Sequence, residues 1–303
     1  MVSLLNALPG AVAQGLIWGI MAIGVYITYR VLDLSDLTVD GSICTGGAVC
    51  IMLMLSGQNV WAAMLGAVLA GMLAGLATGV LHTLMGIPAI LAGILTQLGL
   101  YSVNLKIMGK ANQAINVDKY DLLVSLRFIK NVPFYKNTIL IVALIIVITI
   151  VVLYWFFGTE LGCSLRATGS NDKMARAQGI NTDFTRVLGF MIANGMVALS
   201  GALLSQYQGF ADINMGRGAI VIGLAAVIIG EAVFGKVFRN FGFRLLGVVF
   251  GSIIYYLVLQ VVIWMGIDTD LLKLLSAVVV AIFLAIPYWQ ARYFFNGGKK
   301  GGK

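Results

Sequence analysis

Few residues of this 303-residue chain have the types and spacing to do chemistry, and most of these are acids beside apolar runs. Asp33, Asp36 and Asp40 precede one apolar run, and Glu231 lies within another. The single histidine, His82, and the three cysteines form no metal-ligand pattern and no disulfide framework. With no nucleophile, metal or acid–base constellation in the sequence, we do not expect an enzyme, and the remaining chemistry is non-covalent contact with polar groups.

The acids near residue 40 divide into two kinds. Asp33 and Asp36 are expected to be solvated at the membrane–water interface. Asp40 is followed by Gly and Ser where a helix should begin, so we expect it to cap a broken helix beside a pathway. The candidate pathway-lining polar residues are Thr38, Asp40, Ser42 and Thr45.

A similar pattern of residues occurs in the second half of the chain. Residues 32–49 and 208–225 both place acidic and small polar residues just before an apolar run. Paired interruptions at corresponding positions are typical of membrane proteins whose repeats surround a central path. The pattern therefore predicts two pseudo-repeated halves that contain broken or re-entrant helices.

Other polar residues within apolar runs have a structural interpretation. Glu231 either faces water or a partner inside the membrane, or lies at its cytoplasmic end and pairs with Lys236 or Arg239, which we prefer. Polar side chains on one later run either join helices by hydrogen bonds, which is the default, or line a wet path: Asn194, Ser200, Ser205, Gln206 and Gln208. Glycines at near four-residue spacing predict close helix packing: Gly66, Gly71, Gly75 and Gly79.

The composition decides what positions these residues. The chain is 60% hydrophobic and 11% charged, against about 25% charged in soluble domains, and its mean hydropathy is +0.97. Apolar runs of this length predict an all-α, polytopic transmembrane helix bundle of about eight to nine spans in one domain, residues 1–290, followed by a basic disordered tail, 291–303. The predicted spans are 9–29, 41–55, 61–82, 88–107, 138–157, 185–207, 218–234, 245–265 and 271–288.

Basic residues predict the orientation of the spans. They gather in the segment with Arg166 and Arg186, in the loop with Lys236, and in the tail, all on one side, so that side is cytoplasmic. The net charge of +8 therefore reflects membrane topology, and we expect no nucleic-acid partner. The basic loop 106–136 falls on the opposite side, where it is expected to form an outer platform. Aromatic residues near span ends are expected to act as interfacial anchors: Trp61, Tyr154, Trp155, Tyr255, Tyr256 and Trp289.

A polar segment at residues 161–181 separates two long apolar runs. Ser170 or Asn171 can cap a short helix there, and Asp172 favours its N-terminal dipole. Gly179 can adopt the left-handed conformation that closes it. The segment therefore predicts about two helical turns lying at the cytoplasmic surface, either as a docking element or as an ordinary loop helix.

Residues 165–180, LRATGSNDKMARAQGI, resemble the cytoplasmic coupling segment of permeases of ATP-binding-cassette importers, in the branch with the branched-chain amino acid and ribose permeases. Residues 37–42, LTVDGS, and 87–96, IPAILAGILT, resemble pathway segments of that branch, closest to permeases for tryptophan, tyrosine or other amino acids. The resemblance covers about residues 10–290. It implies a permease subunit in the bacterial cell membrane, surrounded by lipid.

The resemblance also implies partners. They are a second permease copy, cytoplasmic ATPase subunits that hold ATP and magnesium, and an extracytoplasmic substrate-binding protein. The chain itself has no Walker A pattern and carries no cofactor. Within the coupling segment, residues 158–186, the implied coupling residues are Arg166, Gly169, Asn171, Met174, Ala175, Arg176, Ala177, Gly179 and Ile180. Ala175, Ala177 and Gly179 are expected to enter a groove of the ATPase.

Two alternatives stay open at this point. The same family also supports a sugar or nucleoside cargo, and a heterodimer in place of the homodimer. An ion-coupled secondary transporter with no ATPase would need intramembrane carboxylates, for which Asp40 and Glu231 are the candidates.

Overall fold

The computed structural model describes residues 2–117, 119–120, 122–129, 137–235, 237–238 and 240–265, with scattered positions between 271 and 285. Most of the predicted span 271–288, Trp289, Lys236, Arg239 and the tail lie outside the described residues. The elements in chain order are α1 Val2–Tyr26, the π-helical η1 Ile27–Val31, α2 Val39–Leu55, α3 Val60–Thr83, α4 Ala89–Met108, β1 Asn112–Ala114, the 3₁₀ turn η2 Leu126–Ile129, α5 Thr138–Gly158, α6 Glu160–Ser170, α7 Asp172–Ala177, α8 Thr182–Gln208, β2 Phe210–Asp212, α9 Ala219–Phe234 and α10 Phe241–Trp264.

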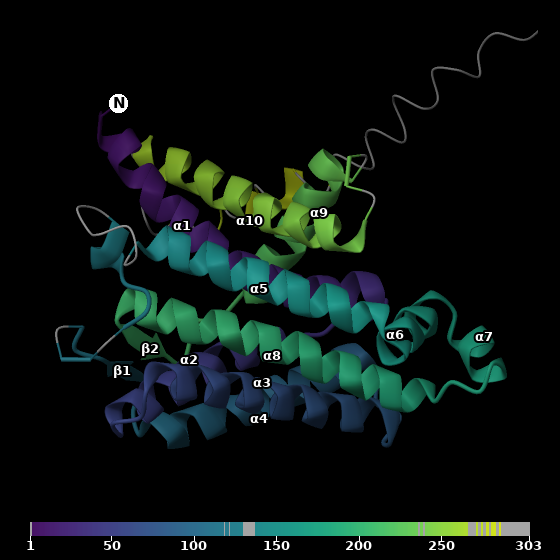
Figure 1. The fold of residues 1–303 in the computed structure, drawn as a ribbon. Coiled ribbons are helices and arrows are strands. Elements are labelled where there is room, and N and C mark those ends of the chain that lie inside the picture. Colours follow the sequence, from purple (N-terminus) through teal and green to yellow (C-terminus); the bar gives the residue numbers. More distant parts are fainter. Residues whose placement is uncertain are drawn as a thin grey trace, which may run out of the picture.

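The long helices lie roughly side by side in one bundle (Figure 1). The N-terminus, β1 and β2 lie at one end, and α6 and α7 extend from the opposite end. Among the described residues, six helices are long and apolar enough to cross a membrane, and α2 and α9 are two shorter apolar helices. This arrangement confirms the predicted polytopic helix bundle.

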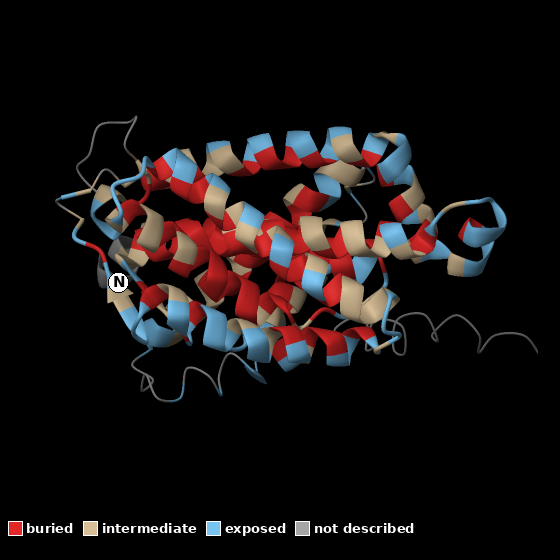
Figure 2. Ribbon diagram, turned by 90° about the horizontal axis from the view of Figure 1, so that it is seen from below, coloured by how far each residue is buried: buried red, intermediate tan, exposed pale blue. Residues whose placement is uncertain are grey.

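Buried residues concentrate in the centre of the bundle, whereas the outward faces of its helices are largely exposed (Figure 2). Helix α1 supplies much of this core, with Ile17, Ile20 and Met21 fully buried. Leu65, Leu69 and other apolar side chains on the outer helices are exposed. A helix with apolar residues outside is suited to hydrocarbon, so the exposed faces match a lipid surround.

Glycines of α3 allow its backbone to approach α8 closely. A Cβ atom on Gly71 would collide with Ala198 and with the Asn194 carbonyl, and one on Gly75 would collide with the Phe190 carbonyl. Small residues permit this approach because no side chain separates the two helices. The predicted glycine face is therefore confirmed as a packing surface.

Polar residues of α8 join helices, as predicted. Ser200 Oγ donates to the Ile17 carbonyl of α1 at 2.8 Å, and Asn194 Oδ1 accepts from Ser42 Oγ of α2 at 2.6 Å. The prediction for two aromatic residues is wrong: Tyr255 and Tyr256 are buried at 0% and 8% exposure, so they belong to the core. Trp61 and Trp155 are exposed at 55% and 70%, in accord with an interfacial or lipid-facing position.

Candidate functional site

The coupling segment is built from three capped helices. The Asn171 side chain accepts from the Met174 amide at 3.0 Å and so caps α7. The Asn181 side chain caps α8 in the same way through the Phe184 amide. Gly179, with a φ of +82°, makes the left-handed turn that the sequence predicted. These local bonds explain why a polar sequence folds into a compact projection beyond the bundle (Figure 1).

Ion pairs fix α7 to the start of α8. Arg176 Nη2 lies 2.8 Å from Asp183 Oδ1, and Arg176 Nε donates to Thr182 Oγ1 at 2.7 Å. Arg186 Nη2 lies 3.2 Å from Asp172 Oδ1. Two arginines and two acids thus hold the turn between α7 and α8.

The outer surface of α7 differs from the expectation at one residue. Met174, Ala177 and Gly179 are exposed, and Ile180 is half-buried. Ala175 is only 3% exposed, because the turn that follows α7 folds back and the Ile180 amide bonds to the Ala175 carbonyl. The Ala175 methyl therefore packs inside the segment, whereas Ala177 and Gly179 remain at its surface.

The coupling segment contacts the end of the first span through Gly169 of α6. A Cβ atom on Gly169 would lie 2.8 Å from Leu32 Cα and would collide with the Val31 carbonyl. Val31 ends η1, and the chain then leaves the helix through Asp33, which is exposed and has a φ of +57°. Helix α6 thus packs directly against Val31 and Leu32, where the helix of the first span ends.

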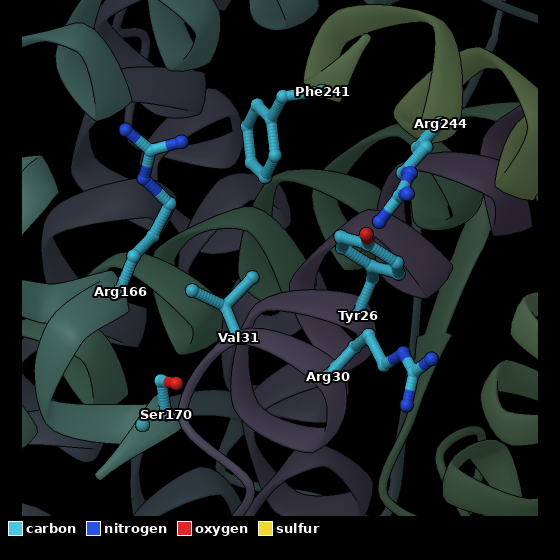
Figure 3. Close-up of a pocket in the computed structure, with 8 residues that line it drawn as sticks. Tyr26, Arg30, Val31, Arg166, Ser170, Phe241 and Arg244 are labelled. Carbon is cyan, nitrogen blue, oxygen red and sulfur yellow. The ribbon is translucent and has the colours of Figure 1, made fainter. Parts of the chain in front are cut away.

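A cavity of about 480 Å³ lies beside this contact, and three arginines line it. Arg166 comes from α6, Arg30 from η1 and Arg244 from α10 (Figure 3). The Arg244 guanidinium lies near the Tyr26 hydroxyl in this view. Arg30 Nε also lies 2.9 Å from Glu231 Oε1. Glu231 therefore forms an ion pair near the end of α9 with Arg30, which is remote in sequence. The predicted partners Lys236 and Arg239 lie outside the described residues.

The segment between η1 and α2 is a buried polar network. Asp36 is 1% exposed, and its carboxylate accepts from the Thr38 amide at 2.9 Å and from Asn194 Nδ2 at 2.7 Å. Ser42 Oγ donates to Asn194 Oδ1 at 2.6 Å. The expectation that Asp36 is solvated is therefore wrong, because Asn194 of α8 covers it, whereas Asp33 is exposed as expected.

The other predicted pathway residues lie near this network. Thr38 is fully buried, and its hydroxyl lies 2.6 Å from the Thr78 hydroxyl, which donates to Thr96 Oγ1 at 2.9 Å. Thr45 is 3% exposed and donates to the Gly41 carbonyl. The structure thus brings Thr38, Ser42 and Thr45 together as bonded groups between packed helices.

Asp40 makes a different set of bonds. Its two carboxylate oxygens each accept a backbone amide at 2.9 Å, from Gly218 and Ile220, at the start of α9. Asp40 therefore caps a broken helix, as expected, but the helix is the short one from the second half of the chain. The short helices that begin in the two similar segments meet here, where a carboxylate offsets the positive end of α9.

A second cavity of about 140 Å³ lies next to Asp40, between α2, α4 and the loop before α9. Its polar wall contains Asp40, Gln97, Tyr101, Asn104 and Arg217. Asn104 is 1% exposed, and its Oδ1 has no hydrogen-bond partner among the described residues. No pattern in the sequence predicted this cavity. The residue in the sequence that could have indicated a polar cavity is Arg217, a cation just before the apolar run 218–234.

Comparisons with known proteins agree with this architecture. Residues 8–286 match the family model described as the permease component of branched-chain amino acid transport systems. The chain is 37% identical to the tyrosine transport system permease protein of Clostridioides difficile, over 93% of this chain and 91% of that one. It is 36% identical to an uncharacterized protein of Rickettsia prowazekii, over 93% and 98%.

Two further likenesses are more distant. The autoinducer 2 import system permease LsrC of Yersinia pestis is 32% identical over 63% of this chain and 52% of its own length. The solved structure described as PsaBC from Streptococcus pneumoniae in complex with Fab shares the fold, with a TM-score of 0.55 at 16% identity over 98% of this chain and 100% of that chain. With the family model and a 37% identical relative both matched along nearly the whole sequence, this multi-pass membrane chain belongs to the permease-component family of branched-chain amino acid transport systems.

Proposed function

We propose that this chain is the membrane subunit of an ATP-driven importer for amino acids. It works as a homodimer with two cytoplasmic ATPase subunits and an extracytoplasmic substrate-binding protein. The observation that carries the proposal is the 37% identity to a tyrosine transport permease along nearly the whole chain. The coupling segment supports it, since residues 158–186 form a rigid, capped projection suited to docking.

The contacts of α6 support a route for the coupling. An ATPase that moves α7 also moves α8, because Arg176 and Arg186 tie the two together. The same segment presses on Val31 and Leu32 through Gly169. Movement of the coupling segment would therefore shift the interrupted region that carries Asp36 and, beyond it, α2 and the start of α9. Such rocking of one part of a bundle against another gives alternating access.

The opposite end of the bundle suits delivery of the solute. The antiparallel pair β1–β2 ties the loop after α4 to the end of α8, with Asn112 opposite Asp212. Lys106, Lys110 and Lys119 belong to the basic segment at this end. Such charges attract an acidic docking surface of a binding protein and speed its association at low salt.

The test is isolation of the chain from native membranes in mild detergent, with identification of what co-purifies. We expect an ATPase with the wild type and its loss with Ala177→Trp, which places a bulky ring on the exposed face of α7. Ala111→Trp, also at an exposed alanine but at the opposite end, is the matched control and should retain the ATPase.

Uptake separates the remaining alternatives. Amino acid uptake by cells that contain the transporter should stop on ATP depletion and persist when an ionophore collapses the ion gradients. If no ATPase accompanies the wild-type chain, and uptake survives ATP depletion but not the ionophore, an ion-coupled transporter replaces this proposal. Uptake of a sugar or nucleoside alone would replace the cargo.

A further inference from the structure

In a membrane spanned by this bundle, the cavity next to Asp40 would lie within the hydrocarbon layer. Helix α9 has 16 residues and α2 has 17, which correspond to about 24–26 Å, so each is shorter than the roughly 30 Å hydrocarbon core. They run toward opposite ends of the bundle from starting points that Asp40 links directly. Gln97 and Tyr101, on the cavity wall, lie in the middle of α4, which is long enough to span.

Arg217 is the unusual residue of this cavity. It is exposed in this chain, and no ion pair or side-chain hydrogen bond joins it to another described residue. An arginine facing lipid near the centre of a span costs about 2.5–3.5 kcal/mol or more, so such residues normally face a wet path or a partner charge. The surface at Arg217 is therefore unsuited to contact with lipid. The side chains of Leu98 and Tyr101 are exposed beside it.

The cavity holds both charges and an unused acceptor. Asp40 occupies one lone pair on each oxygen with an α9 amide, and a carboxylate has about four such sites, so it can accept further donors. Asn104 Oδ1 is a buried acceptor with no partner among the described residues, and a buried polar group of this kind costs about 1–3 kcal/mol unless a ligand or water satisfies it. A cation, an anion and a neutral acceptor thus face one small space.

We propose that this cavity binds the head group of an amino acid during its passage through the permease. Arg217 holds the α-carboxylate through its forked guanidinium, and Asp40 and Asn104 accept from the α-ammonium. The amino acid side chain extends past Tyr101 toward the opening. This inference rests on the proposed function for the presence of an amino acid, and it adds a recognition point in the permease itself.

The direct test is ligand-induced stabilisation of the purified permease in lipid nanodiscs, without any ATPase or binding protein. Since the proposed contacts are with the head group, glycine, L-valine and L-tyrosine at millimolar concentration should each raise the unfolding temperature. Tyramine, which lacks the carboxylate, and 3-(4-hydroxyphenyl)propionate, which lacks the ammonium group, should stabilise much less than L-tyrosine does.

Variants assign the effect to the cavity. Arg217→Gln should weaken amino acid binding about tenfold or more, and Arg217→Lys, which retains the charge without the fork, should weaken it less. Asn104→Leu should weaken binding of amino acids while leaving the weak effect of 3-(4-hydroxyphenyl)propionate unchanged. Gln58→Leu, an exposed glutamine in the turn between α2 and α3, should bind as the wild type does.

Two outcomes overturn the inference. One is the absence of stabilisation by all three amino acids in the wild type. The other is equal binding by wild type and Arg217→Gln when both have the same unfolding temperature without ligand. Neither outcome alters the ATPase co-purification that tests the proposed function, so the two proposals can fail separately.

Discussion

Two regions of this chain are rich in polar residues, and they use them in opposite ways. In the coupling segment, Asn171, Asp172 and Arg176 are bonded to neighbours within about a dozen residues, at an exposed end of the bundle. Around Asp36, bonds join residues more than 150 positions apart inside the bundle. The first region is stabilised locally and can dock as a unit, whereas the second couples the two halves of the chain.

The comparison predicts its largest effect at Asn194, whose side chain joins Asp36 to Ser42. Asn194→Leu leaves one oxygen of the buried Asp36 carboxylate and the buried Ser42 hydroxyl without the partner they have in the wild type, which should lower the free energy of unfolding by about 3 kcal/mol or more. Thermal unfolding in detergent measures this loss. Asn240→Leu is the control, since Asn240 is exposed and makes no side-chain cap bond, and an equal loss there would contradict the role given to Asn194.

The coupling segment contacts the chain that leads to Asp36 through Gly169, and one added methyl group at Gly169 should disturb this contact. Gly169→Ala forces α6 away from Val31 and Leu32, with an expected cost of about 1–3 kcal/mol from overpacking. Stimulation of the ATPase by the loaded binding protein should fall as well, because the pressed contact is displaced. Gly158→Ala, at the end of α5, adds a methyl group that meets nothing within 4 Å and should leave both measurements unchanged.

Within the coupling segment, loss of a cap should have a smaller and local effect. Asn171→Ala removes the bond to the Met174 amide, which costs about 1 kcal/mol. Amide hydrogen exchange should rise across residues 172–177 while α2 and α8 keep their protection. Faster exchange throughout the bundle would show that the two regions are not separable in this way.

The smallest effect is expected at the partly exposed ion pair between Arg30 and Glu231. Glu231→Gln should change the free energy of unfolding by less than about 1 kcal/mol, because solvent screens exposed charges. A double-mutant cycle with Arg30→Gln measures the coupling between the two residues. A coupling energy as large as the Asn194 effect would contradict the distinction between exposed and buried polar contacts.

The sequence by itself determined the membrane spans, the capped turn at Asn171 and Gly179, and the glycine face of α3. These features depend on local propensity or on the periodicity of apolar and small residues, which one segment carries alone. The basic residues near the span ends also predict that Glu231 lies on the cytoplasmic side of the membrane.

Only the tertiary structure decided which polar groups meet. That Asn194 buries Asp36, that Asp40 caps α9, and that Arg30 pairs with Glu231 depend on contacts between residues far apart in the chain. It also decided that Ala175 packs inward and that Asn104 and Arg217 share a cavity. The type of a residue shows that its side chain can form a hydrogen bond or an ion pair. Which partner it bonds to depends on how the helices pack, and no local sequence pattern predicts that.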